Sequence, residues 1–204
     1  MVAQLGEADG SVTHPHLAYL ISPAAPARDL SDAVHALCAV HGDHPGLAGE
    51  ARTSCVQPDA CDWLDAVAEA FVGERAYIAQ LAAAAGPLPS TPGQAETEAA
   101  LITSRHALEM LAKSERRGCA TGAVAALVQD WTTIRLLLDR AAMRFGVEPV
   151  PATFPPQAET AASVAMLGGT PATERAVSFG AQQLLAQHRA IWALLEARAS
   201  AREG

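Results

Sequence analysis

"TGAVAALVQDWTTIRLLLDRAAMRFG", residues 121–146, is the stretch of the sequence that decides the fold class. Its apolar side chains recur every three or four residues, which is the period of one buried face of an α-helix. This apolar stripe consists of Val124, Leu127, Val128, Trp131, Ile134, Leu138, Ala142 and Phe145. Because Gly146 is a typical helix-terminating residue, we predict a helix over about residues 121–145.

The same period predicts three further long helices and no β-strand. The long helices are expected at about residues 60–85, 94–117 and 171–200, and a short one at about 158–167. Ala and Leu are frequent and no sustained apolar–polar alternation occurs, which favours helices over strands. The connections between the first three long helices are short, so these helices are expected to be antiparallel neighbours. The predicted fold is all-α, with a four-helix bundle at its core.

The N-terminal part is predicted to be less regular than the bundle. Gly and Pro recur over residues 1–28 and predict an irregular arm. A short helix is expected at about residues 29–41, followed by a loop over residues 43–59. We therefore expect a single helical domain over residues 1–204, in which residues 1–59 form the arm and an N-terminal helical cap and residues 60–204 form the four-helix core.

Composition excludes several classes of partner. The chain has 204 residues, of which 50% are hydrophobic, and its formal net charge is -8. An acidic chain without a cluster of Lys and Arg is poorly suited to bind nucleic acid or an anionic membrane surface. The sequence starts without the pattern of a signal peptide, and no apolar run reaches the roughly 18 residues of a membrane span. We therefore expect an acidic, cytoplasmic protein that binds neither nucleic acid nor membranes.

The second long helix carries charges on its predicted buried face. Glu98, Arg105 and Glu109 fall on the spacing of its apolar arc, with His106 at the edge of that arc. Arg105 and Glu109 are four residues apart and can pair directly on the helix surface. A buried charge without a partner costs several kcal/mol, so these side chains are expected to meet groups from other helices.

The other three long helices supply such groups. Glu74 and Arg75 flank the apolar centre of the first helix, and Arg135 lies near the centre of the stripe on the third. Asp130 lies on the shoulder of that stripe, and His188 lies at the centre of the inner face of the last helix. Ionisable groups of both signs are therefore expected at the centre of the bundle.

Three interpretations of these residues are open. The first is an internal network of ion pairs and hydrogen bonds that fixes the register of the helices. The second is a metal site for iron, manganese or zinc, with Glu74, His106, Glu109 and His188 as ligands. The third is a pocket for a small anion, held by the guanidinium groups of Arg75, Arg105 and Arg135. The first is the leading interpretation, and it predicts no cofactor.

Carboxylates and histidines inside a four-helix bundle weakly resemble the ferritin-like class, in which two helices carry Glu-x-x-His. Here the second helix has the reversed order, His106-x-x-Glu109, and Leu185 stands three residues before His188. The segment "SERRGCATGAVAALVQDWTTIRLLLDRAAMRFGV", residues 114–147, resembles uncharacterised bacterial helical-bundle proteins of unknown function. The ferritin-like resemblance implies a metal-dependent oxidoreductase as the enzymatic alternative, whereas the second resemblance implies no function.

The remaining histidines and the cysteines are expected to be structural. Four histidines of the N-terminal part, His14, His16, His41 and His44, lie in turn-rich sequence or at its edge. His41 falls on one face with Leu30, Val34 and Leu37, at the end of the predicted short helix. The cysteines are Cys38, Cys55, Cys61 and Cys119, and their spacing matches no metal-binding pair, so free thiols are expected.

Together these features predict an uncharacterised helical protein that binds a small molecule or another protein without acting as an enzyme. A ferritin-like oxidoreductase and a small-anion-binding bundle are the alternatives. A homodimer formed along an exposed apolar strip is also left open.

Overall fold

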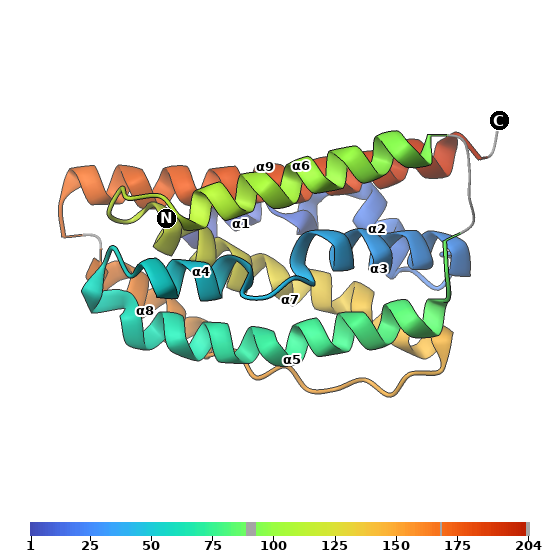
Figure 1. The fold of residues 1–204 in the computed structure, drawn as a ribbon, viewed down its shortest axis with the longest axis horizontal. Helices are drawn as coiled ribbons and strands as arrows, with labels where there is room; N and C mark the ends of the chain where they lie inside the picture. Colours follow the sequence, from blue (N-terminus) through green and yellow to red (C-terminus); the bar gives the residue numbers. More distant parts are fainter. Residues whose placement is uncertain (89–92, 168, 203–204) are drawn as a thin grey trace.

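The computed structural model of the chain describes residues 1–88, 93–167 and 169–202. In these ranges the regular structure is helical and no strand occurs, so the all-α prediction is confirmed (Figure 1). The elements are α1 (Val2–Asp9), η1 (Ser11–Thr13), α2 (Pro15–Ile21), α3 (Ala27–His41), α4 (Gly46–Ser54), η2 (Pro58–Ala60), α5 (Cys61–Ala85), α6 (Gln94–Ala112), α7 (Cys119–Phe145), α8 (Gln157–Leu167) and α9 (Pro171–Ser200).

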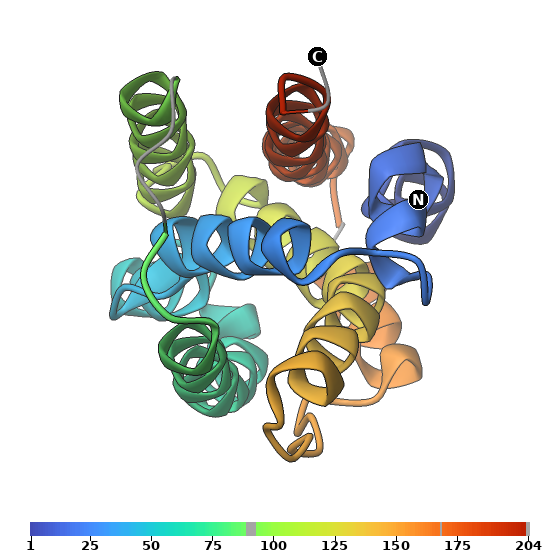
Figure 2. The ribbon, with the colours of Figure 1, turned by 90° about the vertical axis from the view of Figure 1, so that its right-hand side faces the viewer.

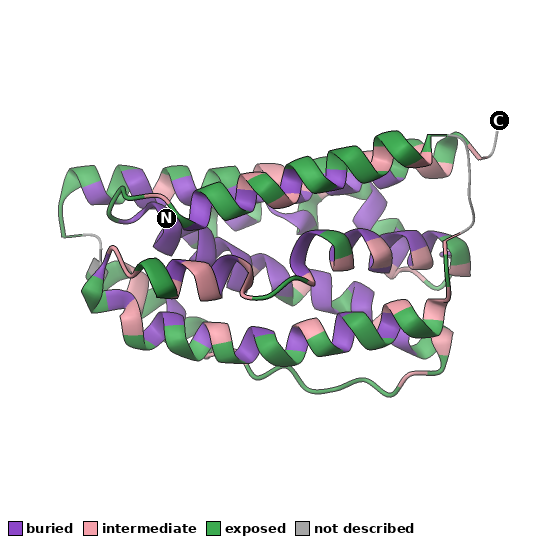
Figure 3. Cartoon of the chain, in the orientation of Figure 1, coloured by how far each residue is buried: buried purple, intermediate pink, exposed green. Residues whose placement is uncertain are grey.

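Helix α7 runs through the middle of the molecule and contacts every other α-helix of the described chain. Eighteen of its 27 residues are buried, many more than one apolar stripe contains. Figure 2 looks along the long axis and shows α7 among the other helices, and Figure 3 shows how much of it is buried. A helix that is apolar nearly all round belongs in a core, which explains its central place.

The four predicted long helices are present as α5, α6, α7 and α9, but they do not cover α7 by themselves. Helices α1 to α4 also contact α7, and α3 packs against α5, α6 and α9 as well. The N-terminal part therefore completes the core, to which Leu17, Leu20, Leu30 and Leu37 contribute buried side chains.

Two glycines allow α7 and α9 to touch backbone to backbone. A Cβ atom on Gly122 of α7 would lie 2.1 Å from the carbonyl oxygen of Val177. A Cβ atom on Gly180 of α9 would lie 1.9 Å from the carbonyl oxygen of Cys119. Since real Cβ atoms do not approach so closely, these positions require glycine, although glycine lowers intrinsic helix stability.

The prediction of an irregular arm over residues 1–28 was wrong, because several of its Gly and Pro residues begin or end helices. Gly10 caps the end of α1, and Pro15 occupies the first turn of α2, where a missing N–H costs nothing. Gly6 lies inside α1 at a close contact, since a Cβ atom there would lie 2.8 Å from Nε2 of Gln129. Helix α1 packs against α7 and α9.

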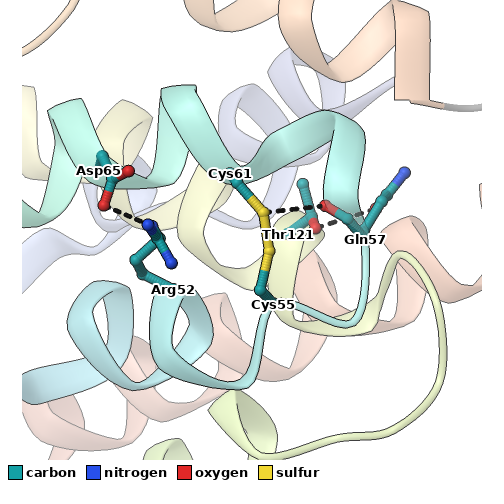
Figure 4. The surroundings of a disulfide bond; sticks show 6 residues. All are labelled: Arg52, Cys55, Gln57, Cys61, Asp65 and Thr121. Carbon is teal, nitrogen blue, oxygen red and sulfur yellow. Dashed lines mark hydrogen bonds and ion pairs between the residues drawn. A yellow bond between two sulfur atoms is a disulfide. The ribbon is translucent and has the colours of Figure 1, made fainter.

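The loop expected at residues 43–59 contains α4 and η2, and it is joined to α5 by a disulfide. Cys55, at the end of α4, bonds to Cys61, at the start of α5, as Figure 4 shows. The prediction of free thiols is therefore wrong for these two cysteines, whereas Cys38 and Cys119 are free. Thr121 of α7 donates a hydrogen bond to the side-chain oxygen of Gln57 at 3.0 Å, which ties the segment between the cysteines to the core.

None of the helices in the described part of the chain combines the length and the apolar character needed to cross a lipid bilayer.

Candidate functional site

Four polar side chains form a hydrogen-bonded row through the core, which we call the central polar row. Asp130 of α7 accepts hydrogen bonds from the backbone N–H of Ser11 at 2.7 Å and from the Ser11 hydroxyl at 2.5 Å. The same carboxylate lies 2.6 Å from Nδ1 of His188 on α9. Nε2 of His188 lies 3.1 Å from Nε2 of His41, the last residue of α3. None of the four residues is more than 6% exposed.

The four members come from four different elements, so the row connects distant parts of the sequence. Ser11 begins η1, and its hydroxyl also accepts a hydrogen bond from Nε1 of Trp192 at 2.7 Å. Because an unpaired buried polar group is costly, these bonds fix α3, α7, α9 and the N-terminal segment relative to one another.

The environment sets the charges in the row. Burial alone would raise the pKa of Asp130, but hydrogen bonds from His188 and Ser11 outweigh burial and lower this pKa. Burial, assisted by the nearby His188, lowers the pKa of His41 well below its usual value. Near neutral pH, Asp130 is therefore a carboxylate and His41 a neutral imidazole. A neutral imidazole has one donor and one acceptor nitrogen, so the bond at Nε2 determines whether Nδ1 of His41 donates or accepts.

A second buried network lies on the other side of Trp131. Arg135 pairs with Glu74 at 2.7 Å, and Nε1 of Trp131 donates to the same carboxylate at 2.9 Å. Arg135 also pairs with Asp139 at 2.9 Å, and its guanidinium lies 4.2 Å from the ring centre of Tyr77. Burial opposes the charge of Arg135, but the two carboxylates outweigh burial and raise its pKa.

The two networks meet at Trp131, so their polar groups form one connected region of the core. The rings of His41 and Trp131 are packed edge to face, with centres 5.1 Å apart. The sequence-based expectation of ionisable groups at the centre of the molecule therefore agrees with the positions of Glu74, Arg135 and His188, which are all buried.

The expected positions of the charged residues on α6 were wrong. Glu98, His106 and Glu109 are exposed, and Arg105 is only partly buried. The buried residues of α6 are Leu101, Ser104, Leu108, Leu111 and Ala112. The buried face of α6 is therefore rotated by about one residue from the predicted stripe. Ser104 occupies a buried position, whereas Ile102 and Met110 are exposed.

The residues named for a metal site do not come together. Glu74 binds Arg135, His188 binds Asp130, and His106 lies on the surface beside Glu109. Among the described residues, no group of three or more His, Cys, Asp or Glu side chains is placed to hold a metal ion.

The three arginines named for an anion pocket also lie apart, each beside acceptors of the protein itself. Arg135 is engaged by Glu74 and Asp139. Arg75 is half-buried and donates to the carbonyl oxygen of Pro45 at 3.2 Å. Arg105 pairs with Asp43 at 2.5 Å.

Sequence reasoning missed Ser11 and His41. His41 had a detectable signal, because it shares a helical face with buried Leu30, Val34 and Leu37. Ser11 had none, since its role depends on η1 folding against α7.

Two cavities lie between the helices. The larger has a volume of about 500 Å³ and lies between α8, the ends of α1 and α9, and the middle of α7. The smaller has a volume of about 240 Å³, lies between α3, α4 and α6, and is lined in part by His41. The cavities share no lining residue.

These features define a class: an all-helical protein with a central buried helix, a hydrogen-bonded polar core and an apolar cavity. The model of a family of unknown function, DUF6975, matches residues 6–203, and the chain belongs to this family. No curated protein and no solved structure matches the chain. Family membership agrees with the expected resemblance to uncharacterised helical proteins, and it assigns no activity.

Proposed function

We propose that this protein binds a small, largely apolar molecule in the cavity under α8 and does not act on it as an enzyme. The observation that carries the proposal is the cavity itself, whose volume of about 500 Å³ falls in the range of about 300–1,000 Å³ typical of small-molecule sites.

The packing of α8 supports a ligand at this place. Its sequence, QAETAASVAML, is rich in apolar residues, yet none of its described hydrophobic side chains is buried. Val164 is only partly buried and Met166 is 85% exposed. An apolar helix that buries so little of its surface gains stability when an apolar molecule fills the space beneath it.

The lining indicates the chemical class of the ligand. Its apolar part includes Val128 of α7, Val164 of α8 and Val177 of α9. Thr160 also lines the cavity, and its hydroxyl is buried without a hydrogen-bond partner in the described chain. Gln129 and Thr132 add further polar side chains to the lining. The Glu174 side chain at the cavity disfavours an anionic ligand. A neutral aliphatic molecule with one hydroxyl or carbonyl group fits these requirements.

A series of straight-chain alcohols tests the proposal. Each buried CH₂ contributes about 0.8 kcal/mol, so affinity is expected to rise about fourfold per methylene from 1-hexanol until the cavity is full. Isothermal titration calorimetry measures the series. Ala161→Phe places a ring in the cavity from α8 and is expected to abolish binding. Ala162→Phe, at an exposed residue on the same helix outside the cavity lining, is the matched control and is expected to bind as the wild type does.

Two results would contradict the proposal. One is an affinity that does not depend on chain length, and the other is equal binding by the Ala161→Phe and Ala162→Phe variants. Sedimentation of the same proteins measures whether they form dimers and distinguishes a third outcome. If the wild type binds no alcohol but forms a dimer that Ala161→Phe dissociates, the cavity is an interface between two copies of the chain.

The central polar row has a structural role in this proposal. Asp130 and His188 hold α7 and α9 together, and these two helices form the floor of the cavity. A cytoplasmic location, the absence of a cofactor and the absence of nucleic-acid or membrane partners stay predictions from the sequence.

A further inference from the structure

The smaller cavity, next to His41, differs in chemistry from the one under α8. Its floor is apolar and contains Val40, Leu47 and Leu108. Its rim is charged, and His41 connects it to the central polar row. It therefore combines a hydrophobic surface, a histidine and ionic groups within about 240 Å³.

The rim carries both signs of charge, arranged in pairs. Arg105 lies 2.5 Å from Asp43 and 3.7 Å from Glu109. Lys113 lies 3.4 Å from Glu50. Two cations and three carboxylates thus surround the opening of the cavity. The net charge of this rim is negative, which disfavours a ligand that carries only a negative charge.

These ion pairs can exchange partners with a ligand. The Arg105 side chain is 35% exposed and that of Asp43 is 65% exposed. Lys113 is 53% exposed. Exposed pairs of this kind contribute little to stability, about 0–1 kcal/mol each, so replacing one partner by a charged group of a ligand has a low cost.

His41 forms the inner wall and cannot serve as a cation there, because its environment keeps it neutral. It interacts through hydrogen bonding and ring packing instead. Its Nε2 is held by His188, so a molecule in the cavity meets an imidazole that is fixed in place by the core.

We propose that this cavity is a second binding site, for a small zwitterion of amino-acid size with a short aliphatic side chain. The carboxylate of the ligand lies between Arg105 and Lys113, and its ammonium group faces Glu50 and Asp43. The aliphatic side chain packs on the apolar floor. The volume is below that of a site for a drug-sized molecule, which agrees with a ligand of this size.

The test compares L-leucine with its two halves, 4-methylpentanoate and 3-methylbutylamine, by isothermal titration calorimetry on the full chain at pH 7.5. L-Leucine is expected to bind, and each half is expected to bind at least about tenfold more weakly, because each lacks one of the two charged contacts. Equal binding of 4-methylpentanoate and L-leucine would overturn the proposal in favour of an anion site. No binding of L-leucine up to about 10 mM would overturn it altogether.

A pair of variants on α6 tests the position of the site. Arg105→Gln removes the guanidinium from the rim and is expected to weaken L-leucine binding at least about tenfold. His106→Gln, at the adjacent exposed residue outside the cavity lining, is expected to leave binding unchanged. Nuclear magnetic resonance gives a second readout, since L-leucine is expected to shift the ring signals of His41. Unchanged affinity in Arg105→Gln, or binding without a shift at His41, would place the ligand elsewhere.

Discussion

Replacing Asp130 with asparagine tests how strongly the central polar row stabilises the fold. The carboxylate accepts two hydrogen bonds from Ser11 and one from His188. Asparagine keeps one acceptor oxygen, but its NH₂ group then faces a donor, so at least one buried donor loses its partner.

The expected loss follows from these contacts. A hydrogen bond to a charged group contributes about 1.5–3 kcal/mol, and a buried donor left without a partner costs about 1–3 kcal/mol. We therefore expect Asp130→Asn to lower the free energy of unfolding by about 3–5 kcal/mol. For a urea dependence of about 2 kcal/mol/M, the unfolding midpoint falls by about 2 M.

Urea unfolding followed by far-ultraviolet circular dichroism measures this change. Asp65→Asn is the matched control, because Asp65 is 53% exposed and pairs only with Arg52 in the described chain. Its expected loss is below about 1 kcal/mol. If the midpoints of the Asp130→Asn variant and the wild type differ by less than about 0.5 M, the hydrogen bonds of the row do not contribute the expected stabilisation.

Three further results are expected. Gly180→Ala forces a Cβ atom into the backbone of α7 and is expected to lower the melting temperature strongly. Gly73→Ala, with nothing near its Cβ position, is expected to stabilise α5 by about 0.5–1 kcal/mol. Equal effects of the two substitutions would contradict the close contact between α7 and α9. In the unfolded chain His41 takes up a proton below about pH 6.5, whereas the folded protein keeps it neutral. The free energy of unfolding is therefore expected to fall as the pH drops from 6.5 to 5, by up to about 1.4 kcal/mol per pH unit, and to fall less steeply in the His41→Gln variant. Equal slopes in the two proteins would argue against a neutral buried His41. Alkylation of the unfolded, unreduced protein is expected to label Cys38 and Cys119 alone, as peptide mass spectrometry would show, and labelling at all four cysteines would contradict the disulfide.

The long helices could be predicted because their hydrophobic period persists over many turns. The burial of His188 followed from the same period, since Leu184 and Ile191 flank it on the inner face of α9. Helix α6 was placed with the wrong rotation, because apolar residues occur around more of its circumference and Ser104 takes a buried position that composition does not reveal.

The central polar row was harder to predict because its members are distant in sequence. Ser11 and Asp130 are separated by 119 residues, and His41 and His188 by 147. Each residue alone is an ordinary buried polar group, and its partner is known only once α3, η1, α7 and α9 are packed. The cavities were unpredictable for the same reason, since they arise from what the helices leave unfilled.

Intermolecular nuclear Overhauser effects (NOEs) between 1-decanol and methyl-labelled protein test the proposed binding of an apolar molecule most directly. If the alcohol lies under α8, its chain is expected to show NOEs to the methyl groups of Val128, Val164 and Val177, which line the cavity. Binding accompanied by NOEs to Val40 and Leu47 of the other cavity, or by none to these three valines, would contradict the proposal.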